Sequence, residues 1–69
     1  MWIKNQNDVL INLDNVDRVK REDNILYAYS SGNKILIAKY NNGYQAYKAI
    51  QIVEKNIKNE TIMMDYPKM

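Results

Sequence analysis

The segment from Ile25 to Tyr40 constrains the fold of this chain most strongly, because it holds two strand-like runs that are apolar on both faces. Ile25–Tyr29 and Lys34–Tyr40 are rich in β-branched and aromatic residues, and the turn-forming sequence Ser30–Asn33 separates them. We therefore predict a β-hairpin here. Side chains alternate between the two faces of a strand, and strands that are apolar on both faces are typically covered on both.

Shorter strands are predicted on either side of this hairpin. Val9–Leu13 shows alternating apolar residues, and a turn rich in Asn and Asp connects it to Trp2–Lys4 in a second hairpin. Val16–Arg21 is expected to be a polar strand. Near the other end of the chain, Thr61–Met64 is strand-like and could add to the edge of the sheet.

One helix is predicted after the central hairpin, from Gly43 to Lys58. Asn42 followed by Gln45 resembles a capping box, in which the Asn side chain accepts a hydrogen bond from a first-turn amide. Apolar residues then recur at spacings of three and four, which is the helical period. They are Ala46, Ala49, Ile50, Val53 and Ile57.

These elements predict one α+β domain over residues 1–69. We expect an antiparallel sheet of four to six short strands, as a meander or a partial barrel, with the C-terminal helix packed on one face. Residues 65–69, which contain Pro67, are expected to form a flexible tail.

A single helix covers only one face of such a sheet, so the second face needs another cover. Either a second subunit packs on the face that we assign to Leu26 and Leu36, or the hairpin that begins at Trp2 folds over to close a partial barrel. The chain has no Cys and no His, so disulfides and the usual zinc ligands are excluded as extra sources of stability. Self-association is the remaining source.

The residue types also limit the chemistry that we expect. Ser30 and Ser31 have no His to activate them, and no pair of carboxylates is placed in a defined pocket. We therefore predict a protein that is not an enzyme and that uses no metal or cofactor. The sequence shows no membrane-spanning run and no secretory signal, so we expect a cytoplasmic protein that does not bind membranes.

Arg18, Lys20 and Arg21 form the densest basic cluster, and phosphate groups could bind there. The alternative is structural, because edge strands carry Lys and Arg to prevent pairing between sheets. The net charge of the chain is only +2, which is a weak signal for nucleic acid. Lys39 and Tyr40, next to the start of the predicted helix, are a second place where a phosphate could bind.

The six tyrosines are the most unusual feature of the composition. Tyr27, Tyr29 and Tyr40 could stack on nucleic-acid bases, but Tyr is also favoured in cores and at protein interfaces. We predict that packing is their main role. Tyr44, Tyr47 and the exposed Ile52 would then form a protein-binding surface, together with Leu26 and Leu36 on the uncovered sheet face.

Several segments carry a resemblance to a known family: the opening MWIKNQ, then LINLDNV, ILIAKYNNGYQAYKAIQIVEKNI and a late MMDYP. The chain resembles short proteins that begin Met-Trp-Ile-Arg, from phages and mobile elements of low-GC Gram-positive bacteria. The resemblance extends nearly to Ile57, although Lys4 stands where Arg is usual. It implies a compact accessory protein of a phage or an integrated element.

Together these features predict a small regulatory protein that binds without catalysis. The expected partners are a second copy of itself and a protein of the phage or the host. The alternative is a nucleic-acid or nucleotide binder, including an anti-defence protein that sequesters a nucleotide signal. Binding through basic residues would weaken steeply with salt, which separates the two hypotheses.

Overall fold

The structure is a computed structural model that describes all 69 residues. It confirms the predicted α+β class with one helix packed on the strands. In chain order, the elements are β1 (Trp2–Lys4), β2 (Leu10–Asn12), the 3-10 helix η1 (Leu13–Asn15), β3 (Arg18–Glu22), β4 (Ile25–Ser30), β5 (Asn33–Lys39), α1 (Gly43–Lys58) and β6 (Met63–Asp65). No helix is both long enough and apolar enough to cross a membrane.

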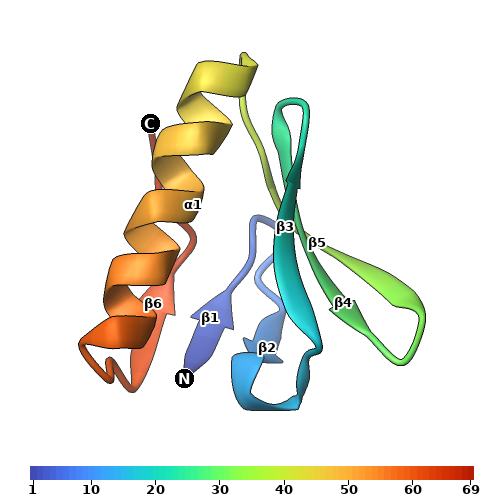
Figure 1. Ribbon diagram of the computed structural model, residues 1–69, viewed down its shortest axis with the longest axis vertical. Coiled ribbons are helices and arrows are strands. Elements are labelled where there is room, and N and C mark those ends of the chain that lie inside the picture. Colours follow the sequence, from blue (N-terminus) through green and yellow to red (C-terminus); the bar gives the residue numbers. More distant parts are fainter.

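The strands form two sheets of three rather than one continuous sheet, in the orders β2-β1-β6 and β3-β4-β5. Figure 1 shows α1 along one side of the molecule and β3-β4-β5 along the other, with β1, β2 and β6 toward the end where the helix terminates. The hairpin predicted at the start of the chain is confirmed as β1 and β2. The strand expected at the sheet edge is confirmed as β6, which lies parallel to β1.

The turn between β4 and β5 is shorter than the sequence suggested. Ser30 and Asn33 pair across the hairpin, so the turn is only Ser31–Gly32. Both turn residues have positive φ, 51° and 80°, which is the geometry of a type I′ turn that matches the twist of the strands. Gly32 adopts this conformation without steric cost.

The register of β4 and β5 contains a β-bulge that changes which residues share a face. Tyr27 pairs with Leu36, but Leu26 pairs with Ala38, so Ile37 is an extra residue on β5. The inner face of the sheet, toward α1, carries Leu26, and the outer face carries Tyr27. Leu36 therefore lies on the outer face, half-buried, whereas Leu26 is completely buried.

The proposed interface role of Leu26 is therefore wrong, because its side chain belongs to the core. Leu26 and Leu36 do not share a second apolar face. The outer face is instead a mixture of half-buried apolar and exposed basic side chains. The sequence predicted self-association because one apolar sheet face would lack a cover. This sheet has no such apolar face, so that reason does not apply to it.

The turn after β1 closes the free edge of β5 around the bulge. The amide of Gln6 donates to the carbonyl of Ile37 at 2.9 Å, and the Gln6 side-chain oxygen accepts from the amide of Lys39 at 2.7 Å. Asn5 Nδ2 donates to the carbonyl of Leu36 at 2.8 Å. The chain's own hairpin thus joins the two sheets at this edge.

The core lies between α1 and the two sheets. Its buried apolar residues are Ile3, Ile11, Leu13, Leu26, Ala28, Ile37, Ala38, Tyr40, Ala46, Ala49 and Val53. On the helix, small side chains at Ala46 and Ala49 allow a close approach to the strands. Ile57, the last residue of the predicted apolar stripe, differs from the others because half of its surface remains exposed.

The helix has the predicted bounds and the predicted cap. Asn42 Oδ1 accepts from the amide of Gln45 at 2.9 Å, and Gln45 Oε1 accepts from the amide of Asn41 at 3.1 Å. These two bonds satisfy backbone donors at the start of the helix that have no partner within it. Lys55 and Lys58 in the last turn complement the negative end of the helix dipole.

The chain end is docked on the molecule, so the prediction of a flexible tail over 65–69 is wrong for its first three residues. Asp65 belongs to β6, and the amide of Tyr66 donates to the carbonyl of Lys4 at 2.9 Å. Pro67 is buried, and its carbonyl accepts from the Tyr40 hydroxyl. The hydrogen bond between the Tyr40 hydroxyl and Pro67 therefore holds this part of the tail in place.

Candidate functional site

The outer face of β3-β4-β5 concentrates basic and tyrosine side chains, and we call it the basic tyrosine face. Cross-strand pairing puts Tyr29 between Arg18 and Lys34, and Tyr27 between Lys20 and Leu36. The complete face consists of Arg18, Lys20, Glu22, Ile25, Tyr27, Tyr29, Lys34, Leu36 and Lys39. Four cations and one carboxylate give it a net charge of +3, more than the +2 of the whole chain.

The two tyrosine rings on this face are held by cations. The guanidinium of Arg18 lies 4.4 Å from the ring centre of Tyr29, and Lys34 Nζ lies 4.3 Å from that of Tyr27. The rings themselves meet edge to face, with centres 6.4 Å apart. Cation–π contacts of this kind are worth about 0.5–1 kcal/mol at exposed sites, so a competing ligand can displace them.

Glu22 is the one carboxylate on the basic tyrosine face, and it is already engaged. Its Oε1 accepts from Lys34 Nζ at 2.9 Å, and its Oε2 accepts from the hydroxyl of Tyr29. The hydrogen bond to Glu22 raises the pKa of Lys34, so this ammonium stays charged. Arg18, Lys20 and Lys39 are exposed and form no ion pair. These three cations are available to an anionic ligand.

The structure brings together only part of the predicted phosphate-binding residues. Arg18, Lys20 and Lys39 share the basic tyrosine face, but Arg21 pairs opposite Leu26 on the inner side and donates to the carbonyl of Asp23 at 2.8 Å. Tyr40 is buried with only 8% of its surface exposed, and its hydroxyl donates to the carbonyl of Pro67, so it does not belong to the basic tyrosine face.

Lys34 was missed by the sequence interpretation, although the hairpin register could have revealed it. A two-residue turn at Ser31–Gly32 places Lys34 directly opposite Tyr29. Recognition of the type I′ turn would therefore have predicted its position on the basic tyrosine face.

A second surface is apolar and lies where the helix terminates beside β1 and β6. Trp2 and Met63 pair on neighbouring strands, and Ile62 precedes Met63 directly. Together with Ile57 at the last turn of α1, they are 43% to 82% exposed. We call these four residues the apolar end. The sequence does not reveal the three strand-region residues as a surface, because alternation cannot be read reliably in strands of three residues, and Ile57 was predicted to belong to the apolar stripe of the helix.

A groove of about 480 Å³ opens at the apolar end. Its apolar lining is Met1, Trp2, Leu13, Ile57 and Ile62, and its polar lining is Asp14, Glu60 and Thr61. A second groove of about 440 Å³ runs between α1 and β3 and shares Leu13 and Ile57 with the first. The two grooves thus adjoin at Leu13 and Ile57.

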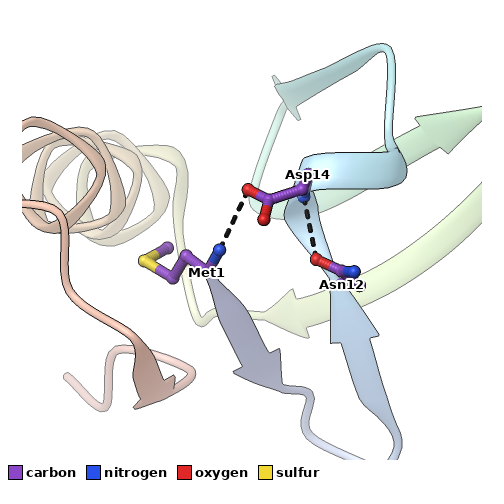
Figure 2. Close-up of polar contacts among 3 residues, drawn as sticks. All are labelled: Met1, Asn12 and Asp14. Atoms are coloured by element: carbon purple, nitrogen blue, oxygen red, sulfur yellow. Dashed lines mark hydrogen bonds and ion pairs between the residues drawn. The ribbon is translucent and has the colours of Figure 1, made fainter.

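The charges at the edge of the first groove neutralise one another. The N-terminal ammonium of Met1 lies 3.0 Å from Asp14 Oδ1, and the amide of Asp14 donates to Asn12 Oδ1 at 3.1 Å (Figure 2). The Asn12 side chain thereby caps η1 and holds Asp14 in reach of the ammonium. Glu60 is then the remaining unpaired charge in this groove.

The predicted protein-interface residues do not form one surface. Tyr44 and Tyr47 are exposed near the start of α1, where Lys48 lies over the Tyr44 ring at 5.9 Å. Ile52 is exposed as well, but five residues of helix separate it from Tyr47 by about 140° around the axis. Leu36 lies on the basic tyrosine face.

No group of three or more His, Cys, Asp or Glu residues is placed to hold a metal ion. Every buried side-chain nitrogen and oxygen has a hydrogen-bond partner.

No protein-family model, curated protein or solved structure matches the chain. What the two surfaces offer chemically is apolar contact at one and charge with aromatic rings at the other.

Proposed function

We propose that this protein is a protein-interaction module that works without catalysis, and that its first partner is a second copy of itself bound through the apolar end. The observation that carries this proposal is the position of Ile62, which is 82% exposed beside a groove of about 480 Å³. At this exposure the Ile62 side chain makes little contact within its own subunit, and its burial in a partner would be favourable.

A protruding side chain next to a groove on the same surface favours a symmetric dimer. In a two-fold dimer each subunit presents the same patch, so Ile62 of each copy can fill the groove of the other. Full burial of a side chain of this size contributes about 1.5–3 kcal/mol. Trp2 beside the groove adds a residue type that often dominates binding energy at interfaces.

Electrostatics also favours the apolar end over the basic tyrosine face as the self-association surface. The pair formed by Met1 and Asp14 leaves Glu60 as the one unpaired charge of the groove, so two copies repel each other only weakly there. Two basic tyrosine faces, each with a net charge of +3, would repel each other. The resemblance to short phage proteins supports a regulatory role for such a dimer.

The test is the solution mass of the protein and of two matched variants. We expect a dimer at micromolar concentration by light scattering. Ile62→Asp should give a folded monomer, because it places a charge in the interface. Ile52→Asp makes the same change on the predicted helix surface and should leave the dimer intact. A wild-type monomer at high concentration, or a dimer that survives Ile62→Asp, would contradict the proposal.

A further inference from the structure

We infer that the basic tyrosine face is a separate binding site for single-stranded nucleic acid, in which cations contact phosphates and Tyr27 stacks on a base. This inference does not depend on self-association, because the face shares no residue with the apolar end. Its ligand is defined by the chemistry of the face: dispersed cations around aromatic rings on an open sheet.

Charge complementarity identifies the ligand as an anion. The net charge of +3 on this face exceeds that of the chain, so the rest of the molecule carries a net −1. The cations lie on both outer strands, with Arg18 and Lys20 on β3 and Lys34 and Lys39 on β5. A ligand that crosses the sheet can therefore contact a cation on either side of the central strand.

The aromatic rings favour nucleic acid over an acidic peptide. Tyr27 and Tyr29 occupy alternate positions of the central strand β4 and lie between the two rows of cations. Bases stack on such rings while the phosphates run past the cations, which is how sheets bind single strands without sequence preference. An acidic peptide would use the cations and leave the rings unused.

The contacts seen on the rings show how a ligand can enter. Lys34 covers the ring of Tyr27 at 4.3 Å and also pairs with Glu22. Its flexible side chain can leave the ring when a base arrives, and it then meets a neighbouring phosphate. The ring of Tyr29 is less available, since its hydroxyl is bound to Glu22 and Arg18 lies over it. Tyr27 is therefore the stacking residue.

The experiment measures binding of a fluorescent oligothymidylate of about 20 nucleotides at several salt concentrations. With three to four phosphate contacts, the logarithm of the affinity should fall with the logarithm of salt with a slope of about −2 to −3. A rise from about 50 to 200 mM salt then weakens binding by about 15- to 60-fold.

Variants on each strand test the site itself. Lys20→Gln and Lys39→Gln should each reduce the slope by about 0.7 and weaken binding about fivefold at 0.1 M salt. Lys55→Gln, the same charge change on α1, is the control and should have little effect. Circular dichroism checks that each variant is folded.

The stacking step is tested with Tyr27→Leu, which keeps an apolar residue but removes the ring. We expect binding to weaken by about tenfold or more, whereas Tyr44→Leu on the helix should bind like the wild type. Polyglutamate of equal length is the competing probe. Equal affinity for polyglutamate, with no effect of Tyr27→Leu, would replace nucleic acid by an acidic protein as the ligand. No binding of the oligothymidylate at low salt would refute the inference outright.

Ile62→Asp keeps the two proposals apart. It should abolish the dimer and leave the intrinsic affinity of each subunit for the oligothymidylate unchanged. Weaker binding of the oligothymidylate in Lys20→Gln, with the dimer intact, would in turn show that the basic tyrosine face acts by itself.

Discussion

Replacement of Asn5 by Ala should destabilise the protein more than any other exchange in its turns. Asn5 is the one buried polar side chain, with 4% of its surface exposed. Its Oδ1 accepts from the amides of Asn7 at 2.9 Å and Val9 at 2.8 Å, and its Nδ2 donates to the carbonyl of Leu36. One side chain thus shapes the turn after β1 and ties this turn to β5.

The expected loss follows from the three bonds. Each hydrogen bond contributes about 0.5–1.5 kcal/mol net to stability. Because Asn7 and Val9 are exposed, water can bind their amides in the variant and offset part of the loss. The carbonyl of Leu36 sits at the bulge under the turn and is harder to hydrate. We therefore expect Asn5→Ala to lower the free energy of unfolding by about 2–3 kcal/mol. The total free energy of unfolding of a domain of this size is about 3–10 kcal/mol.

Urea denaturation monitored by the fluorescence of Trp2 measures this loss. With a slope of about 1 kcal/mol per molar urea for a small domain, the midpoint should fall by about 2–3 M. Asn7→Ala is the control, since the Asn7 side chain forms no hydrogen bond, and it should stay within about 0.5 kcal/mol of the wild type. If Asn5→Ala were as mild as the control, Asn5 would not join the two sheets.

Two further predictions concern the core. Burial raises the pKa of Tyr40 to about 12, with a smaller contribution from Tyr66. The neutral phenol therefore contributes its full stabilisation below pH 10, and this contribution is lost as the pH rises from 10 to 12. The free energy of unfolding of the wild type should therefore fall by about 2–3 kcal/mol over this pH range, as measured by alkaline unfolding. Tyr40→Phe should not show this fall, and equal pH profiles of the two proteins would contradict the prediction. Leu26→Ala should cost about 2–5 kcal/mol in urea denaturation and Leu36→Ala about 1 kcal/mol, whereas equal losses would refute their assignment to opposite faces.

Elements with strong local signals could be predicted from the sequence. The helix has both a cap at Asn42 and a periodic apolar stripe, and its bounds in the structure agree with the prediction. The central hairpin also forms as expected, because its β-branched and aromatic runs are long. These features depend on residues close together in the chain, and the sequence contains all the information that they need.

Features that depend on contacts between distant parts of the chain could not be predicted. The bulge at Ile37 is stabilised by Gln6, which lies 31 residues earlier in the chain and bonds to its carbonyl. Nothing in the alternation of β5 indicates that contact, and the bulge moves Lys39 to the face that carries Leu36. The position of Leu36 opposite Tyr27, in contrast, follows from the short turn at Ser31–Gly32. The docked tail also depends on a distant contact, because the carbonyl of Pro67 accepts a hydrogen bond from the hydroxyl of Tyr40. Hydrogen bonds between residues far apart in the chain therefore determine both features.

The structural explanation of the basic residues, protection of a sheet edge, accounts for only half of the basic tyrosine face. β3 is an edge strand, and no backbone hydrogen bond joins its free side to another element, so Arg18 and Lys20 are well placed to prevent pairing between sheets. The edge of β5 is already closed by the bonds from Gln6 to Ile37 and Lys39. Edge protection therefore does not account for Lys39, whereas the ligand that we propose, which crosses the sheet, would account for its exposed charge on the same face as Lys20. For this reason Lys39→Gln, more than Lys20→Gln, decides between edge protection and nucleic-acid binding.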